Sequence, residues 1–581
     1  MLGAALCSSA FAATAVTVNV TADNSPVDLS AYKETAESTP VNLLDGEHVI
    51  TITMDNGTAI NNGSTSLGDT RVQIGSITLN GTNSTAEFQA TAGTYYGIVN
   101  SEYNQATLAL NGGTLKKTGT GEMLIANTAA DAGTLNLAEG SIRLLSKNNG
   151  TYALNGENLT LTAADGTTLR VDKQSRLKRF NSAGSVTLYA ELSTGYLTLT
   201  SGSVTGTGTL KVNGNTTGNN DNIDVDLSRI QSAITLYQAK GTLEAASQGD
   251  ITADIKLQNY NWAGANWNNV KGSSYTFTGA ITCDVNDGGS MVFDGSSGKK
   301  AVAVTFTSDL SGWANSGNTD YKGLRSAKGM NLDVTISGDP VNKAIANAFN
   351  ADNVSNKDTQ NGLMSLTLDR DASIAGQIKV NNLTVNSGKE VSTSSNTVII
   401  KNAITVKAGA SLTMATSAAK TAESLTLGTG ATLTLGTADS HNNDLNITGS
   451  LTVEGDSEHQ TTLNANLVMN SGTLTFADGA VLTMGCDVTI GDTVTVMLTD
   501  TMVESIMAGN YVEIFSGVTH SYLSQNLTFS GSGDLSGYVT THEAEYSLKQ
   551  VGDKIYITPE PATATLSLLA LAALAARRKR R

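Results

Sequence analysis

A short phrase, in which Thr stands between two aliphatic residues, recurs through the C-terminal half of this 581-residue chain. Alternation with a period of two puts the aliphatic side chains on one face and Thr on the other, as in a half-buried β-strand. Gly, Asn or Asp near the end of most phrases supplies a turn. Examples are Leu383-Thr384-Val385, Ile404-Thr405-Val406, Leu412-Thr413-Met414, Leu425-Thr426-Leu427, Leu433-Thr434-Leu435, Leu451-Thr452-Val453, Leu474-Thr475-Phe476, Val488-Thr489-Ile490 and Val494-Thr495-Val496.

Equivalent aliphatic positions recur about every 20 residues, which is the repeat length of a stack of short strands. Two or more strands in each such repeat fit a right-handed parallel β-helix (β-solenoid), in which every rung buries its aliphatic face on the next. We therefore predict an all-β fold with parallel β-helix repeats over 363–498. A tandem of antiparallel sandwiches is the alternative. The two series of equivalent positions are Leu412, Leu433, Leu451 and Leu474, and Leu425, Leu445, Leu467 and Val488.

The composition favours strands that are paired on both sides. Pro occurs only 5 times, and a Pro cannot donate to a β-ladder, whereas Thr, Val and Leu are abundant. The net charge is −16, so the chain has no overall attraction for nucleic acid. Beyond Cys7 the chain has two cysteines, Cys283 and Cys486, which leaves open either one disulfide or two buried thiols.

Outside the repeats the pattern changes along the chain. The expected regions are a β-solenoid-like region (13–169), an irregular β region with insertions (170–362) and a C-terminal β cap (499–557). A short helix, Val341 to Asn350, is expected after Pro340. In the cap, Thr501 and Glu504 form a capping box for a helix through Met507. Strands are expected from Tyr511 to Phe515 and within Tyr546 to Ile557.

Both ends carry export features. Residues 1–12 form a short apolar run ending in Ala10-Phe11-Ala12, which suits a signal peptide cleaved after Ala12. Lipidation of Cys7 is an alternative that Leu6, a large residue just before it, disfavours. At the other end, Pro559-Glu560-Pro561 precedes the mostly apolar segment 562–576, which spans roughly 22 Å as a helix. The basic residues that follow hold the C-terminus in the cytoplasm by the positive-inside rule, namely Arg577, Arg578, Lys579, Arg580 and Arg581.

These three parts in order resemble the PEP-CTERM sorting signal of Gram-negative bacteria. The resemblance covers 558–581 only, and the strand phrases also resemble those of autotransporter passenger domains. The sorting resemblance implies a transient inner-membrane insertion through a transmembrane sorting helix. It further implies that an exosortase-type membrane peptidase cleaves near Pro559, Glu560 and Pro561 and passes the body to the cell surface or extracellular matrix. A plain membrane anchor is the alternative.

Clustered carboxylates are the candidates for enzymatic chemistry. Residues i and i+2 share a strand face, so Asp224 and Asp226 of the group Asp221 to Asp226 could hold calcium or act as acid and base. Asp369 and Asp371 are the second such group. The alternative for both is a solvated turn. The sequence contains no metal-binding or nucleotide-binding motif, so neither a metal nor a cofactor is expected.

Two further groups suit glycans. A basic run could hold an anionic glycan or form a solvated loop between domains. An aromatic group among Asn residues could stack on sugars or pack in the core. The basic run is Arg170, Lys173, Arg176, Lys178 and Arg179, and the aromatic group is Tyr260, Trp262 and Trp267, with Trp313 further along.

The leading hypothesis is a non-enzymatic, exported structural or adhesive protein of the cell surface or extracellular matrix. Its expected partners are the exosortase-type peptidase and exopolysaccharide or host and surface glycans, without nucleic acid. A polysaccharide-active lyase or hydrolase on the same scaffold is the first alternative, and an autotransporter-like adhesin is the second.

Overall fold

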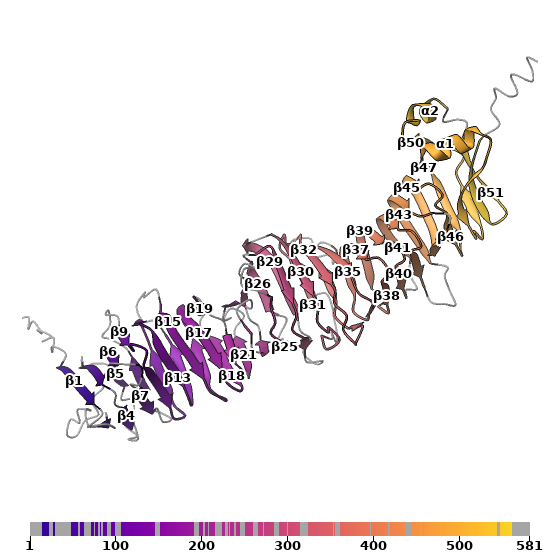
Figure 1. Cartoon of the computed structure of the whole chain (residues 1–581). Coiled ribbons are helices and arrows are strands. Elements are labelled where there is room, and N and C mark those ends of the chain that lie inside the picture. Colours follow the sequence, from indigo (N-terminus) through magenta and orange to yellow (C-terminus); the bar gives the residue numbers. More distant parts are fainter. Residues whose placement is uncertain are drawn as a thin grey trace, which may run out of the picture. The chain divides into compact units, whose positions relative to one another are not determined.

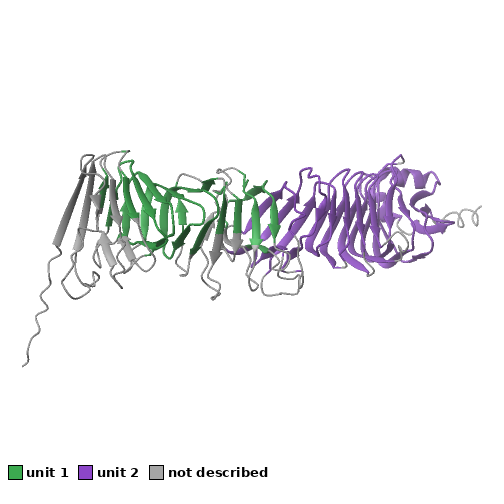
Figure 2. Ribbon diagram, turned by 90° about the horizontal axis from the view of Figure 1, so that it is seen from below, with its two compact units in different colours: residues 1–293, 297–299 green, residues 294–296, 300–581 purple. Residues whose placement is uncertain are grey.

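The computed structural model gives the chain as strand stacks in two compact units (Figures 1 and 2). Unit 1 comprises residues 1–293 and 297–299, and unit 2 comprises 294–296 and 300–581. The structure describes residues 14–21, 27–28, 48–55, 58–62, 71–74, 76–79, 82, 85–89, 95–98, 106–145, 152–190, 197–200, 204–206, 208–214, 224–226, 230–231, 233–237, 240–243, 250–258, 265–270, 272–283, 290–298, 300–313, 323–352, 354, 361–395, 397–415, 419–436, 443–456, 458–542 and 546–559.

The fold is mostly β, with 62% strand and 4% helix, and its long parallel sheets are consistent with a β-solenoid. The predicted fold class is confirmed at this level. Antiparallel pairing occurs at the C-terminal end, where β52 pairs with β48 and β51.

Unit 1 contains two large sheets of parallel strands. The first has 14 strands, in the order β1-β3-β6-β9-β12-β15-β13-β10-β7-β4-β2, with β17 pairing β15, β19 and β20. Its strands are β1 (Thr14–Thr21), β2 (Val27–Asp28), β3 (His48–Asp55), β4 (Thr58–Asn62), β6 (Ser76–Leu79), β7 (Thr85–Gln89), β9 (Ala106–Ala109), β10 (Thr114–Thr118), β12 (Thr128–Ala130), β13 (Gly133–Leu137), β15 (Leu154–Ala163), β17 (Ser175–Ser182), β19 (Leu197–Leu199) and β20 (Val204–Gly206).

The second sheet of unit 1 has 10 strands, in the order β28-β25-β23-β21-β18-β16-β14-β11-β8-β5. They are β5 (Arg71–Ile74), β8 (Tyr95–Ile98), β11 (Glu122–Ile125), β14 (Ser141–Leu144), β16 (Thr168–Val171), β18 (Val186–Ala190), β21 (Thr209–Gly214), β23 (Ala233–Tyr237), β25 (Ile255–Gln258) and β28 (Ile281–Cys283). A further row of parallel strands contains β22 (Asp224–Asp226), β24 (Lys240–Leu243), β26 (Ala265–Val270) and β27 (Ser274–Phe277). The unit boundary falls within β29 (Ser290–Gly298).

Register stacks of aliphatic side chains form the core of unit 1. Leu115 lies opposite Leu135, Leu135 opposite Leu161, and Leu161 opposite Phe180, and all four are fully buried. Each such burial contributes roughly 1.5–3 kcal/mol. The apolar residues of the period-two pattern therefore form the core and stabilise the stack, as the sequence indicated.

Unit 2 repeats this arrangement with two sheets. The strands of its longer sheet are β30 (Ala301–Phe306), β31 (Gly323–Ala327), β32 (Asn331–Ile336), β34 (Phe349–Ala351), β35 (Leu363–Leu368), β37 (Ile378–Val385), β39 (Val398–Val406), β41 (Lys420–Leu427), β43 (Asp444–Val453), β45 (Asn466–Phe476), β47 (Val488–Leu498), β49 (Ser521–Leu523) and β50 (Thr528–Gly531). The strands of the shorter sheet, in pairing order, are β33 (Ala344–Ile345), β36 (Ala372–Ile374), β38 (Glu390–Thr393), β40 (Ser411–Met414), β42 (Thr432–Leu435), β44 (Thr461–Asn464), β46 (Leu482–Met484), β48 (Val512–Ser516), β52 (Lys554–Pro559) and β51 (Tyr546–Val551).

The predicted strand phrases are confirmed, but the two series of equivalent positions were partly wrong. Leu451 lies opposite Leu425 rather than continuing from Leu433, whose neighbour on the far side is Leu463. Leu445 lies opposite Lys420. Rung length is not constant, because connecting segments of different length join the strands, so a fixed period of about 20 residues pairs the wrong phrases.

The helix expected from Val341 to Asn350 was wrong. This stretch contains β33 and β34, which pair in parallel with β36 and β37: Ala344 lies opposite Ser373 and Phe349 opposite Ile378. Local composition is a weak prior for a helix, and the parallel ladder overrides it here.

The C-terminal cap contains the two helices of the described chain, α1 (Asp500–Met507) and α2 (Ser536–Thr541). The helix predicted to end at Met507 is confirmed, but its N-cap is Thr499, whose hydroxyl accepts a hydrogen bond from the Met502 amide at 3.2 Å. The expected cap, Thr501, instead donates to the Asp478 carboxylate. The predicted strand near Tyr511 is β48, and the stretch from Tyr546 forms the hairpin β51–β52.

Candidate functional site

The predicted sorting motif begins at Pro559, the last residue of the β51–β52 hairpin. Ile557 of β52 lies opposite Val512 of β48 on one side and opposite Leu548 of β51 on the other. Thr558 is buried, and its hydroxyl lies 2.9 Å from that of Ser547. Pro559, half-exposed and opposite Tyr546, is the last residue of β52 and has no amide N–H to donate. Two residues of the segment 558–581 are thus part of the cap.

The remaining export residues lie outside the described part of the chain. These are Ala10 and Ala12 of the signal peptide, Glu560 and Pro561 of the motif, the apolar segment 562–576, and Arg577, Arg578, Lys579, Arg580 and Arg581. None of the helices in the described segments is long and apolar enough to cross a membrane. The predictions on these residues stay predictions.

Asp369 and Asp371 lie in the turn between β35 and β36, each with its own partner. The Asp369 carboxylate accepts a hydrogen bond from the Asn386 amide at 2.7 Å. Asp371 lies 2.6 Å from the Lys343 ammonium and accepts from the Glu390 amide. The hydrogen bond from Lys343 lowers the pKa of Asp371, which keeps this carboxylate ionised. Such an environment suits a structural ion pair and not a general acid.

Arg370, between these two aspartates, points into the protein. Its side chain is buried, and its Nη1 donates to the carbonyl oxygens of Ser308 and Ser337 at 2.9 and 3.2 Å. Burial lowers the pKa of Arg370. The guanidinium therefore links turns of three successive rungs and does not take part in a surface site.

Of the other acidic group, Asp224 and Asp226 lie in β22, opposite Lys240 and Thr242 of β24. The backbone thus has the strand conformation that the i, i+2 argument requires, while Asp221 lies outside the described residues. Among the residues that the structure describes, no group of three or more His, Cys, Asp and Glu could hold a metal ion.

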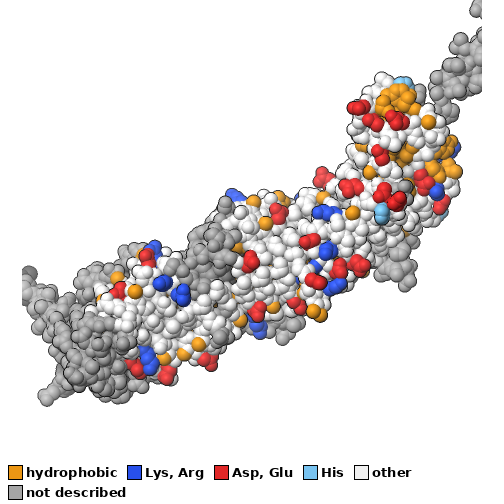
Figure 3. All heavy atoms as spheres, in the orientation of Figure 1, with side chains coloured by type: hydrophobic (Ala, Val, Ile, Leu, Met, Phe, Trp, Pro, Cys, Tyr) orange, Lys and Arg blue, Asp and Glu red, His pale blue; other side chains and the backbone are white. Residues whose placement is uncertain are grey.

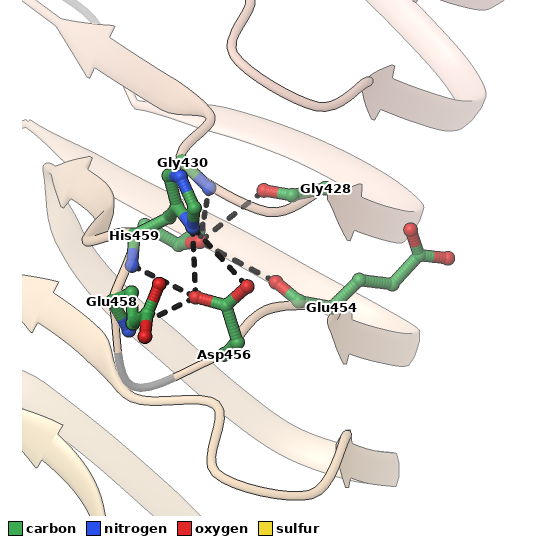
Figure 4. A network of polar contacts seen from close by, with 7 residues as sticks. Gly428, Gly430, Glu454, Asp456, Glu458 and His459 are labelled. Atoms are coloured by element: carbon green, nitrogen blue, oxygen red, sulfur yellow. Dashed lines mark hydrogen bonds and ion pairs between the residues drawn. The ribbon is translucent and has the colours of Figure 1, made fainter.

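A polar network that the sequence did not indicate joins two turns of unit 2 (Figure 4). The Asp456 carboxylate accepts hydrogen bonds from the amides of Glu458 and His459, both at 2.9 Å, and lies 2.9 Å from His459 Nδ1. The buried Thr461 hydroxyl accepts from the Gly430 amide and donates to the Gly428 carbonyl. The network fastens the connection before β44 to the preceding rung.

The charged side chains of this network, Asp456 and His459, are exposed. The hydrogen bond to Asp456 raises the pKa of His459, and the same contact lowers the pKa of Asp456. The geometry produces a stable ion pair in a surface turn and leaves the Asp456 carboxylate occupied by three donors. A catalytic role finds no support in it.

The basic run lies in strands, so the alternative of a solvated loop between domains was wrong. Arg170 lies in β16, and Arg176, Lys178 and Arg179 lie in β17. Lys173 lies between these two strands and is half-exposed. Asp172, fully buried, accepts from Arg143 Nε at 2.8 Å and from Arg170 Nε at 2.7 Å. The sequence did not indicate this carboxylate, because its two partners lie in different strands.

The aromatic group does not gather in one described place. Trp313 is fully buried, with its ring 6.1 Å from that of Phe306, so it is a core residue. Trp267 lies in β26, and Tyr260 and Trp262 lie outside the described residues. Cys283 and Cys486 are both buried thiols that form no disulfide, which answers the question that their spacing left open.

With this geometry established, the fold defines a mostly β protein built from long stacks of parallel strands. No protein-family model matches the chain, and no curated protein sequence matches it. Function has to be argued from the chain's own motifs and contacts.

Proposed function

We propose that this chain is an exported structural or adhesive protein of the cell surface or extracellular matrix, with a non-enzymatic body. In this proposal the body is a right-handed parallel β-helix closed by the cap. A short transmembrane sorting helix follows, and an exosortase-type membrane peptidase cleaves at the motif Pro559, Glu560 and Pro561.

The observation that carries the proposal is the end of the β-ladder at Pro559. β52 is paired with β48 up to Ile557 and with β51 up to Pro559. A peptidase needs an accessible substrate, and in the sequence Glu560 and Pro561 follow directly after the last residue of β52. The folded body and the sequence motif therefore meet at Pro559.

The body supports a display role through its alternating strands. Aliphatic residues are buried along each rung, and Thr, Asn and Ser of the same strands remain half-exposed, as in the burial of β45 and β47. Rungs that stack only on their neighbours lengthen a protein without enlarging its core cross-section, which is an economical way to present a polar surface.

The alternative, a polysaccharide lyase or hydrolase, is less well supported. It needs carboxylates that converge without other partners, whereas Asp369 and Asp371 are occupied by Asn386 and Lys343. No observation on the described residues favours an autotransporter-like adhesin over the sorted surface protein.

The test is C-terminal peptide and intact-mass spectrometry on the chain recovered from inner-membrane, surface and medium fractions of an expressing cell. A surface or medium product that ends close to Pro559–Pro561 supports the proposal. A full chain that retains Arg577–Arg581 in the inner membrane contradicts it and indicates a plain anchor. Glu560→Ala should block the processing, and Asp553→Ala, an exposed acidic residue of the β51–β52 turn, is the matched control.

A further inference from the structure

One segment of unit 1 carries an excess of positive charge that the whole chain does not share. From residue 143 to residue 190 the sequence has seven basic and three acidic residues, a net charge of +4, whereas the complete chain has −16. Figure 3 shows Lys and Arg side chains on the surface of unit 1 in that view. Charge of this sign on an acidic protein can attract an anionic ligand locally.

Two of these cations are neighbours in adjacent strands. Arg143 of β14 lies opposite Arg170 of β16, and Arg170 lies opposite Tyr189 of β18. All three lie on the outer face, because Leu144 and Val171, the next residues along their strands, are fully buried. Adjacent strands are about 4.8 Å apart, so the two guanidinium groups would repel each other without a counter-charge.

Asp172 supplies a counter-charge to both cations. Its buried carboxylate binds the Nε of both Arg143 and Arg170, and the Arg143 side chain stays 27% exposed. One buried carboxylate shared by two guanidinium groups holds both of them in place. The partly exposed Arg143 guanidinium is thus preorganised for an external anion.

The cations continue around the corner onto β17. The guanidinium of Arg176 lies 4.1 Å from the centre of the Tyr152 ring, and its Nη1 binds Glu157. Lys178 and Arg179 follow on the same strand and are exposed. The six described cations thus occupy neighbouring rungs, and three of them are held by carboxylates: Arg143 and Arg170 by Asp172, and Arg176 by Glu157.

The geometry points to a binding site for an acidic polysaccharide, formed by Arg143, Arg170, Lys173, Arg176, Lys178 and Arg179. A linear polymer with a carboxylate in each repeat matches cations that recur from rung to rung, and guanidinium groups bind carboxylates through paired N–H donors. Arg170 and Arg176 lie over the rings of Tyr189 and Tyr152, which leaves charge and not ring stacking for recognition. Recognition by charge favours an acidic glycan over a neutral glycan. It also disfavours a single-stranded nucleic acid, whose bases stack on accessible aromatic side chains.

The test measures binding of the purified full-length chain to polygalacturonate by isothermal titration calorimetry, with dextran and single-stranded DNA as the other probes. We expect binding to polygalacturonate that weakens with salt, and no binding to dextran. The double variant Lys178→Gln, Arg179→Gln changes two exposed residues and leaves the Asp172 contacts intact. It should weaken binding about tenfold.

The matched control is Lys401→Gln, Lys407→Gln, which removes the same charge from two exposed positions of unit 2 and should bind as the unmodified chain does. A second variant, Arg143→Gln, tests the pair held by Asp172. The inference is overturned if the unmodified chain does not bind polygalacturonate. Equal loss in the control variant, or equally tight binding of DNA, also overturns it. The sorting proposal is judged by processing at Pro559 and is independent of this result.

Discussion

The ammonium group of Lys117 donates a 2.9 Å hydrogen bond to the backbone carbonyl oxygen of Glu139, which follows the neighbouring strand. It also donates to the carbonyl oxygens of Thr118 and Gly119, at 2.9 and 2.6 Å. Lys117 is fully buried at an inward position, opposite Leu137 in the register of β10 and β13. Three carbonyl groups thus replace its hydration shell at the edge of the core.

Because of this burial, the stability of unit 1 should depend on pH in the alkaline range. Desolvation lowers the pKa of Lys117 from 10.5 to about 8. A folded pKa below the unfolded one costs stability while both states are protonated, and the cost is relieved as the pH rises from about 8 to 10.5. One pKa unit corresponds to about 1.4 kcal/mol, so the full effect is about 3 kcal/mol.

Lys117→Met should remove this dependence. The measurement is the difference in unfolding free energy between the variant and the unmodified chain, from urea titrations at pH 7 and pH 10.5. Between pH 7 and pH 10.5 the unfolding free energy of the unmodified chain should rise relative to that of Lys117→Met, whatever the difference between the two at pH 7. Lys116→Met, at the neighbouring outward position, keeps Lys117 and should show no such relative change. A pH-independent difference for Lys117→Met would contradict the assignment.

The inward face of the unit 2 rungs should tolerate no loss of volume. Leu451 is fully buried between Leu425 and Leu474. Leu451→Ala should cost about 2–5 kcal/mol, because the stacked neighbours cannot collapse into the gap. Thr452→Ala, at the adjacent half-exposed position, should stay within about 0.5 kcal/mol. Urea-induced loss of the circular dichroism signal measures both, and equal losses would show that the alternation does not define the core.

The ion pair of Asp456 with His459 should be visible in the titration of the imidazole. Hydrogen bonding to Asp456 raises the pKa of His459, so the pair stabilises its turn at low pH and is lost as the pH rises through that value. In Asp456→Asn the pKa of His459 should fall towards about 6.5. NMR titration of the His ring signals measures it, with His459→Gln for assignment. Glu458→Gln should shift it less, and a larger shift there would contradict the contact.

The period-two phrases were enough to predict strands and their buried faces, because alternation is a local property of the chain. Their pairing was not predictable in the same way. Leu433 is followed in its stack by Leu463, and the 29 residues between them include a connection whose length no pattern fixes. The β-strands between Val341 and Asn350 were missed because their ladder partners lie in other rungs.

The candidate sites divide along the same line. The sorting motif could be recognised from contiguous residues, and so could the basic run. The carboxylate that holds the arginines, Asp172, could not be recognised in this way, because it binds Arg143 of one strand and Arg170 of the next. Arg370 carried no signal of burial either, since the carbonyl groups that hold it lie 33 and 62 positions earlier. Long-range contacts of this kind follow from the stacking of rungs.

Two glycines of unit 2 should respond very differently to the same substitution. Gly472 has φ +108°, and a Cβ there would lie 1.8 Å from the Gly449 carbonyl oxygen, which is backbone and cannot move aside alone. Gly388 has φ +69°, and a Cβ there would meet nothing within 4 Å. Gly388→Ala should therefore cost only the left-handed backbone conformation, about 1–2 kcal/mol. Gly472→Ala carries a steric clash in addition, because neighbouring rungs approach at the β43–β45 contact, and should lower the urea midpoint clearly further. Comparable midpoints for the two variants would mean that the rungs can separate at Gly449, which would contradict the close backbone approach at Gly472.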